Sequence, residues 1–317
     1  MLRYTLRRVG MLGVTLLVAS VLIFLMTAVL PGDIGRIILG PFADESAVQA
    51  LNESLGLDDP LLRRYFDWIG GVLQGDWGRS MSLNTPVLPL ALERFGRSLV
   101  LAALGIAVLL PLAVGAGVAA GRRPDGVLDR SLSVVGLGLG AMPEFVTGTL
   151  LIVIFGLGLE WFPVQATTPA DDSFWTVVHG LALPAICLVL LLFAYLFRMA
   201  RSGMISALEA DYTRTARLKG LPERIVLRRH VLRNALLSTV TVMGAQLGWL
   251  VGGLVVVESL FRYPGIGSLL HNAALNKDIP LLAGCTLLVT AVFSLANLAA
   301  DLVYALLNPR VRGALAD

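Results

Sequence analysis

The chain has 317 residues, of which 56% are hydrophobic and only 15% are charged, and its mean hydropathy is +0.78. Soluble domains carry about a quarter charged residues, so this composition excludes an ordinary soluble enzyme or binding module and indicates a membrane protein. The formal net charge is only +3, so the distribution of the charges along the chain is more informative than their sum.

Six apolar stretches are long enough to cross a bilayer, because a hydrocarbon core of about 30 Å needs roughly 20 helical residues. Backbone groups find no partners in lipid, so each stretch should be a helix. The stretches are residues 9–30, 98–120, 131–159, 181–197, 235–257 and 279–307. The sequence therefore predicts an all-α integral membrane protein with six transmembrane helices.

The first stretch follows three arginines, as a signal peptide would, but its apolar run is too long and "LPGDIG" lacks a small-x-small cleavage site. We interpret it as a retained helix.

The long polar segment after the first stretch, residues 31–97, should hold two helices. One begins at the acidic residues of "DESAVQ" and ends at Gly56, and the other has Pro60 in its first turn and Gly75 beyond its end. The apolar residues of the second helix recur every three or four positions, which predicts an amphipathic helix lying on the membrane or on a neighbouring subunit. They are Leu62, Tyr65, Phe66, Ile69, Val72 and Leu73.

The third stretch is longer than a span requires and contains Pro143-Glu144, which predicts a kink or a surface segment. Charged residues inside spans are functional candidates by default, and Glu144 is therefore a candidate for the transport pathway. Glu258 and Asp301 lie nearer to the ends of their spans. A relay through such carboxylates would make the chain a proton-coupled secondary transporter, which is the alternative interpretation.

The loop after the fourth stretch, residues 198–234 and called here the basic loop, holds nine of the 25 Lys and Arg residues. We expect a helix that continues to Gly220, with a stripe of Met204, Leu208, Tyr212 and Ala216. Gly220 should end this helix in a left-handed conformation, and Pro222 with Glu223 should begin the next one, which runs into the fifth stretch. The result is a sharp corner between two helices, a shape that fits a groove on a partner.

The sequence lacks the residues that several kinds of chemistry require. A phosphate-binding Gly-Lys-Ser/Thr loop is absent, since the two lysines lie in "RLKGL" and "LNKDI", so ATP hydrolysis would need another polypeptide. No His or Cys spacing suits a metal, and Cys187 and Cys285 read as reduced, buried residues. Ser268 and His271 could be imagined as a nucleophile and base of a membrane hydrolase, but no elbow motif accompanies them. We predict no catalytic residue and no metal.

Charge also predicts orientation. With both termini in the cytoplasm, the inside segments hold 17 of the 25 Lys and Arg residues, while the two short outside loops hold two. The long segment 31–97 has six arginines, but nine acidic residues accompany them, and long loops cross largely regardless of charge.

The basic loop carries a family resemblance. "YTRTARLKGLPERIVLRRHVLRNALL" resembles the EAA loop of inner-membrane permease subunits of ATP-binding-cassette (ABC) importers, specifically the oligopeptide/dipeptide/nickel permease family. "LPGD", "LGLDDPLLRRYFDWIGGVLQGDWGRSM", "AMPEFVTGTLLI", "WFP", "VVESLFRYPGIGSLL" and "DLVYALLNPRVR" are similar to family signatures in the same order, so the resemblance covers nearly the whole chain. Two positions depart from the pattern: Ser238 stands where the family commonly has Pro, and Arg214-Thr215-Ala216 replaces the general Glu-Ala-Ala.

The resemblance implies a type I ABC importer permease fold, with residues 1–317 as a single transmembrane domain in a bacterial cytoplasmic (inner) membrane. It implies a heterodimer with a second permease, two ATPase subunits that bind ATP and Mg, and an extracytoplasmic solute-binding protein; no cofactor in this chain and no nucleic-acid partner is expected. Di- or oligopeptides are the expected substrates, with nickel, glutathione or oligosaccharides as alternatives. ATPase coupling is assigned by the resemblance to Arg214, Thr215, Ala216, Arg217, Lys219, Gly220, Leu221, Pro222, Glu223 and His230.

The segment "VESLFRYPGIG" matches a family position near the outer gate. Glu258, Pro264, Gly265 and Gly267 are therefore expected to build the gate or its loop, and not to act on substrate. The segment 31–97 is expected to receive the second permease and the binding protein.

Overall fold

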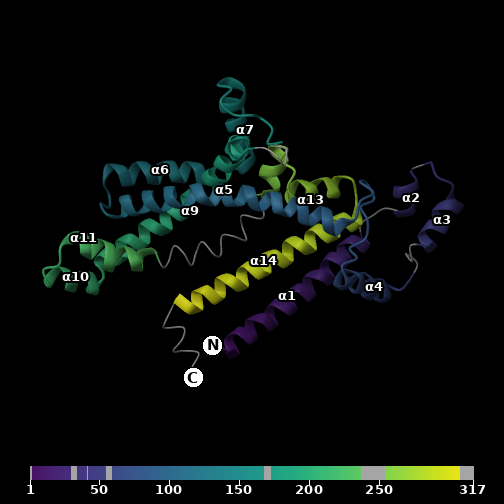
Figure 1. Ribbon diagram of the computed structural model, residues 1–317, viewed down its shortest axis with the longest axis horizontal. Helices are drawn as coiled ribbons and strands as arrows, with labels where there is room; N and C mark the ends of the chain where they lie inside the picture. Colours follow the sequence, from purple (N-terminus) through teal and green to yellow (C-terminus); the bar gives the residue numbers. More distant parts are fainter. Residues whose placement is uncertain are drawn as a thin grey trace. The chain divides into compact units, whose positions relative to one another are not determined.

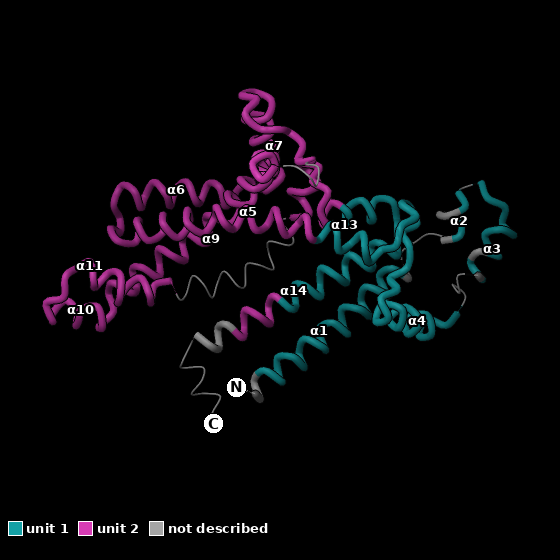
Figure 2. Tube along the Cα trace, viewed as in Figure 1, with its two compact units in different colours: residues 1–95, 269–295 teal, residues 96–268, 296–317 magenta. Residues whose placement is uncertain are grey.

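A computed structural model describes residues 2–29, 34–40, 42–54, 59–167, 173–236 and 254–307. These residues are helical almost throughout, and the described part contains no strand beyond one isolated bridge, between Arg79 and Pro86 (Figure 1). The chain divides into two compact units, residues 1–95 with 269–295 and residues 96–268 with 296–317 (Figure 2).

The first unit begins with α1 (Leu2–Val29), and three short helices follow it: α2 (Ile34–Leu39), α3 (Glu45–Ser54) and α4 (Leu61–Gln74). The two helices predicted in the segment 31–97 are confirmed as α3 and α4. Pro60 lies at the N-cap of α4, and Gly75 ends the helix at φ 89°, a left-handed conformation that glycine adopts without steric cost. Gly56, the predicted end of α3, lies outside the described residues.

Helix α4 packs on α1 through an aromatic cluster. The rings of Tyr65 and Trp68 lie 5.5 Å and 5.9 Å from that of Phe24, and the Tyr65 hydroxyl is 2.9 Å from the hydroxyl of Ser20. On a neighbouring face of α4, Leu62 and Phe66 are exposed. One part of the predicted apolar stripe therefore packs against α1, and the other part is exposed. Trp68 was not among the residues of the predicted stripe, but it lies on the packed part.

In the second unit, α5 (Val87–Gly121) leads to α6 (Val127–Ala141), which packs against α9 (Ala182–Glu209). The third predicted stretch is not one straight helix. It is bent by 105° between α6 and the pair formed by α7 (Glu144–Leu151) and a π-helical turn, η1 (Ile152–Gly158). Pro143 is the N-cap of α7, so the kink expected at Pro143-Glu144 is confirmed.

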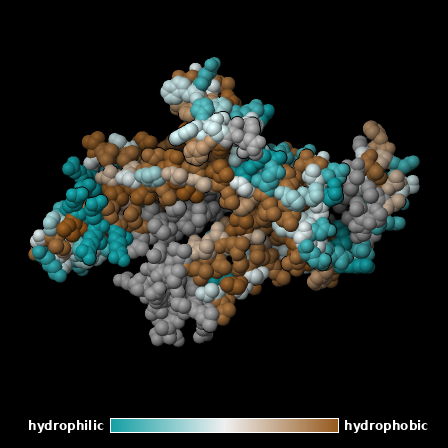
Figure 3. All heavy atoms as spheres, viewed as in Figure 1, coloured by the Kyte–Doolittle hydropathy of each residue, from teal (hydrophilic) through white to brown (hydrophobic). Residues whose placement is uncertain are grey.

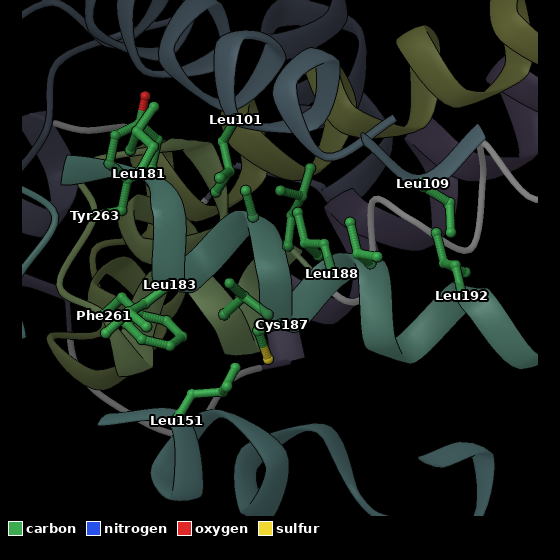
Figure 4. Packing of buried hydrophobic residues seen from close by; sticks show 14 of the residues in the cluster. Leu101, Leu109, Leu151, Leu181, Leu183, Cys187, Leu188, Leu192, Phe261 and Tyr263 are labelled. Atoms are coloured by element: carbon green, nitrogen blue, oxygen red, sulfur yellow. The ribbon is translucent and has the colours of Figure 1, made fainter. Parts of the chain in front are cut away.

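The core of the second unit lies between α5, α7 and α9 (Figure 4). Leu101 and Leu109 of α5, Leu188 and Leu192 of α9, and Leu151 of α7 are buried in it. Nearer the end of α5, glycines let it approach α9 closely: a Cβ at Gly117 would lie 2.6 Å from the Cβ of Ala200, and one at Gly121 would lie 2.7 Å from that of Met204. Small residues of this kind are typical of helix contacts in membranes, where backbones approach each other.

The remaining described helices are α8 (Phe174–Gly180), α10 (Asp211–Leu218), α11 (Glu223–Ile225) with η2 (Val226–Val231), α13 (Ile266–Leu275) and α14 (Ile279–Leu307). Four described helices are long and apolar enough to cross a membrane, and a fifth is added if the bent pair is one span. Most of the fifth predicted stretch, residues 237–253, lies outside the described residues. In Figure 3 apolar residues cover α6 and α9, and hydrophilic residues gather over α10 and α11.

Candidate coupling site

The basic loop folds into a compact helical corner at the end of α9. The helix ends at Glu209 because Ala210 is extended, with φ −67° and ψ 146°, and α10 begins immediately after it. The buried hydroxyl of Thr213 donates to the carbonyl of Ala207 over 2.7 Å and holds α10 against α9. The break divides the predicted continuous helix in two, and so the predicted stripe is interrupted: Met204 and Ala216 are buried, whereas Tyr212 is 41% exposed.

Gly220 ends α10 as predicted, in a left-handed conformation with φ 73°. Its N–H donates to the carbonyl of Arg217 over 2.9 Å, and the N–H of Leu221 donates to the carbonyl of Ala216 over 3.4 Å. These two bonds are the Schellman arrangement that closes a helix C-terminus. No heavy atom lies within 4 Å of a Cβ built at Gly220, so the backbone angle, and not lack of space, requires glycine here.

The chain then turns directly into the next helix. Pro222 is the N-cap of α11, with φ −56° and ψ 136°, one position earlier than the first-turn place predicted for it. Helical residues continue through η2 to residue 236, where the described segment ends. The two helices of the corner are thus joined by a turn of only four residues, 219–222.

An ion pair bridges the two helices of the corner. Arg217 donates two hydrogen bonds to the carboxylate of Glu223, over 2.8 Å and 3.2 Å. These bonds lower the pKa of Glu223 and raise that of Arg217 from their usual values, and burial opposes both shifts. Both side chains are about half exposed, and exposed pairs contribute only about 0.2–1 kcal/mol. The pair therefore links α10 to α11 but contributes little to stability.

A small apolar core supports the corner from inside. Six residues of α9, α10 and the following helix are buried together, with Leu221 and Leu227 packed at the edge: Met204, Ala207, Ala216, Val226, Val231 and Ala235. Ala216 therefore faces the interior, whereas Arg214, Thr215 and Lys219 are exposed. The ring of His230 is half-buried, and its backbone carbonyl accepts a hydrogen bond from Asn234 over 2.7 Å.

The outer surface of the corner also carries bare apolar side chains. Leu218 is 80% exposed, Ile225 43% and Tyr212 41%. The sequence analysis gave Leu218 and Ile225 no role, because neither belongs to the i, i+4 stripe predicted from Met204 to Ala216. Exposed leucine and isoleucine among arginines make this surface suited to contact with another protein.

The second group of predicted residues lies in a separate, tightly bonded turn. The side chain of Glu258 is fully buried and accepts hydrogen bonds from the hydroxyl of Ser98 and from the backbone N–H groups of Gly267 (2.7 Å) and Ser268 (3.0 Å). Ser98 Oγ in turn accepts from the N–H of Ile266 over 2.8 Å. Glu258 and Ser98 thereby satisfy three of the free N–H groups at the start of α13.

Two glycines of this turn are required by close neighbours. A Cβ at Gly265 would overlap the carboxylate of Glu258, and a Cβ at Gly267 would lie 2.6 Å from the Cα of Val255. Pro264 directly precedes Gly265 and completes the turn. The structure thus brings Glu258, Gly265 and Gly267 together as a loop framework, which is the arrangement expected of a structural turn.

Two buried carboxylates were missed by the sequence analysis. Asp129 of α6 is 2% exposed and holds Arg201 of α9 in a two-pronged ion pair, with one bond of 2.6 Å. Asp278 precedes α14 and accepts hydrogen bonds from Ser80 Oγ (2.5 Å) and from Ser82 Oγ (2.7 Å) and N (2.9 Å). Burial opposes ionisation of Asp278, but these bonds outweigh it, so its pKa lies below the usual value.

Pro143 and Glu144 lie at the bend between α6 and α7, where Glu144 is the first residue of α7 and is half-buried. Its backbone carbonyl is 3.7 Å from the sulfur of Cys187.

Within the described ranges, no three His, Cys, Asp or Glu side chains are grouped as a metal ion would need.

Comparison with known proteins agrees with this architecture. Residues 113–313 match the family described as the binding-protein-dependent transport system inner membrane component, and residues 1–102 match its N-terminal part. A protein of Brucella suis biovar 1 described as a peptide permease is 38% identical over 318 residues, covering 98% of this chain and 99% of the relative. The glutathione transport system permease protein GsiC of Salmonella typhimurium is 39% identical over 316 residues, and that of Escherichia coli K12 is 38% identical. Each alignment covers 98% of this chain and 99% of the relative.

These matches extend over both units and include the basic loop and the turn at Glu258. The chain therefore belongs to the family of binding-protein-dependent transport system inner membrane components and is a permease subunit of an ABC importer in the inner membrane.

Proposed function

We propose that this permease imports di- or oligopeptides. We also propose that the helical corner at Gly220 binds an ATPase subunit and couples its ATP-driven conformational change to the spans. The observation that carries the proposal is the closed corner itself, in which α10 and α11 are fixed by the Schellman turn, the Arg217–Glu223 pair and a buried core. Its exposed Leu218 and Ile225 then supply the apolar contacts for a groove on the partner.

Coupling of this kind needs an element with two positions that both partners bias. The helix that begins at Glu223 continues without a break to residue 236, the start of the fifth predicted span. Movement of the corner would therefore pass directly into that span. In the proposed cycle, closure of the ATPase subunits tilts the spans from an inward-facing to an outward-facing arrangement.

The proposed complex contains parts that this chain does not supply. ATP and Mg bind to two ATPase subunits, because neither Lys219 nor Lys277 lies in a phosphate-binding loop. A second, similar permease forms the other half of the path, and a solute-binding protein delivers substrate to the segment 31–97. Within the chain we propose six spans, with both termini in the cytoplasm and residues 1–317 as one transmembrane domain.

Gly220→Val tests the coupling role. A β-branched residue at φ 73° is strained by at least about 1–2 kcal/mol, so the turn should open while the buried spans remain intact. We expect normal amounts in the membrane but an uptake reduced about 5- to 150-fold, the range that a coupling free energy of about 1–3 kcal/mol gives. Uptake and ATPase activity are measured with the complete complex in proteoliposomes.

Gly75→Val is the matched control, because Gly75 also has a positive φ and open space around its Cβ, but it ends α4 and not the corner. It should keep ATP hydrolysis coupled to uptake. Normal uptake by Gly220→Val would contradict the coupling role. Uptake that persists without ATP and collapses with a protonophore would instead favour the proton-coupled alternative.

The substrate is tested through the cognate solute-binding protein, since the permease names among the relatives include both peptide and glutathione transport. We expect the binding protein to retain short peptides and the complex to take up a labelled tripeptide. Retention of glutathione, nickel or an oligosaccharide in its place would reject the peptide assignment while leaving the permease function intact.

A further inference from the structure

Two adjoining cavities lie beside the helical corner, where α5 and α9 end. Their volumes are ≈ 400 Å³ and ≈ 350 Å³, within the range of about 300–1,000 Å³ that is usual for ligand sites, and both are lined by Arg122, Glu223 and Leu227. We propose that this double cavity, called here the arginine pocket, binds the headgroup and upper acyl chain of an anionic phospholipid.

The charge of the pocket favours an anion. Five arginines line it, Arg122, Arg123, Arg217, Arg224 and Arg228, against two glutamates, Glu209 and Glu223. Glu223 is already paired with Arg217. Among the described residues, no carboxylate lies within ion-pair distance of the other four arginines. Guanidinium groups bind phosphate through paired hydrogen bonds, so the second cavity, lined by Arg122, Arg224 and Arg228, suits a phosphodiester, with Arg123 in the adjoining one.

Part of the lining of each cavity is apolar, which favours a lipid over free phosphate. Ile205 and Leu208 of α9 line the first cavity, and Val118 and Leu232 line the second. A free phosphate or another small polar anion would gain nothing from these side chains. A phospholipid would place its phosphate at the arginines and an acyl chain along the aliphatic side chains.

The position along the helices is also that of a membrane surface. Val87–Gly121 and Ala182–Glu209 are both long and apolar enough to cross a membrane, and Arg122 directly follows the end of the first. Arg122 and Arg123 therefore lie where the first of these spans would leave the hydrocarbon and meet the headgroups. Basic pockets between helix ends at such a level are suited to acidic lipids. A lipid bound here would touch α5, α9 and the corner helix together and would stabilise the corner against α9.

The test compares three double variants in the purified complete complex. Arg122→Gln with Arg224→Gln removes two charges from the pocket, and Arg130→Gln with Arg229→Gln removes two exposed charges that do not line it. Each basic residue near an anionic surface strengthens binding about fivefold, so the pocket variant should retain phosphatidylglycerol about 30-fold more weakly.

The control should match the unmodified complex, and Arg122→Lys with Arg224→Lys should keep most of the binding. Bound lipid is measured by mass spectrometry after delipidation and incubation with vesicles of phosphatidylcholine, with or without phosphatidylglycerol.

Equal retention by the pocket and control variants would overturn the proposal. So would full displacement of the lipid by inorganic phosphate, which would show a simple anion site. If the pocket variant loses its ATPase subunits but keeps the lipid, the arginines serve protein docking and the proposal is again wrong. Because the readout is bound lipid, it is independent of transport: a complex that imports normally but shows no difference in lipid rejects this inference and leaves the proposed function standing.

Discussion

At the scale of single residues, Glu258 is a fully buried carboxylate at the end of a predicted span, and its hydrogen bonds favour a structural role. Its oxygens accept hydrogen bonds from a hydroxyl and two backbone N–H groups, and Gly265 leaves the space that the carboxylate fills. A proton relay needs a carboxylate that can exchange its proton with water or substrate. A fully buried side chain whose partners are two N–H groups of the adjoining turn and the hydroxyl of Ser98 on α5 is instead suited to holding that turn in place against α5.

Glu258→Ala is therefore predicted to destabilise the protein strongly. Each buried donor left without an acceptor costs about 1–3 kcal/mol, so the loss of three should lower the free energy of unfolding by about 3 kcal/mol or more. Glu258→Gln should cost less, because its amide oxygen can still accept from the N–H groups of Gly267 and Ser268. Thermal unfolding of the purified protein in detergent measures the effect.

The exposed Glu53 provides the control, since Glu53→Ala should change stability by no more than about 0.5 kcal/mol. If Glu258→Ala melts like the unmodified protein but abolishes uptake, the carboxylate acts in transport and the structural assignment is wrong.

At the scale of elements, the buried pair of Asp129 and Arg201 ties α6 to α9 next to the basic loop. The side chain of Asp129 is 2% exposed and that of Arg201 is 28% exposed, so the pair is shielded from water far more than the Arg217–Glu223 pair. Removing one partner of a buried pair leaves an uncompensated charge.

Asp129→Ala should therefore lower the free energy of unfolding by about 3 kcal/mol, the lower end of the usual range because Arg201 keeps some contact with water. Glu223→Ala, which breaks the exposed pair, should cost at most about 1 kcal/mol. Replacing both partners by apolar residues, as in Asp129→Leu with Arg201→Met, should recover most of the loss. Thermal unfolding compares the three variants, and a double variant no more stable than Asp129→Ala would contradict the assignment.

Elements that depend on local backbone chemistry were predictable from the sequence. Gly75 and Gly220 end their helices at positive φ, and Pro143 marks the bend, because each acts through its own backbone and needs no distant partner. The break at Ala210 was missed because alanine carries no turn signal, and a hydrogen bond from Thr213 fixes it.

Contacts between distant parts of the chain were not predictable. Asp129 and Arg201 are 72 positions apart, and Ser80 and Asp278 are 198 apart, so no spacing rule connects them. A partial signal existed at Asp278: an Asp just before an apolar run is typical of a helix N-cap, and its Oδ1 accepts from the N–H of Leu281 over 3.3 Å. That signal predicts the cap but not the two serines.

At the scale of the whole molecule, the bend between α6 and α7 determines the membrane topology. A pair of helices bent by 105° can cross a membrane as one broken span or return to the side from which it came. The two possibilities place the loop 159–180 on opposite sides. The distribution of Lys and Arg favours crossing, because the loop 159–180 contains none, whereas the segment 121–130 before the bend contains three.

Labelling of single cysteines tests this topology. In a background with Cys187 and Cys285 replaced by alanine, a cysteine is placed at exposed Gln74, Ser173 or Thr215. If the bent pair crosses, a membrane-impermeant maleimide applied to intact spheroplasts should label positions 74 and 173, and position 215 should react only after permeabilisation. If the pair returns to its own side, position 173 is protected in intact spheroplasts and position 215 is labelled from outside, which would reverse the orientation proposed for the corner. A corner outside the cell could not meet an ATPase, so labelling at position 215 in intact spheroplasts would overturn both the six-span topology and the coupling role of Gly220.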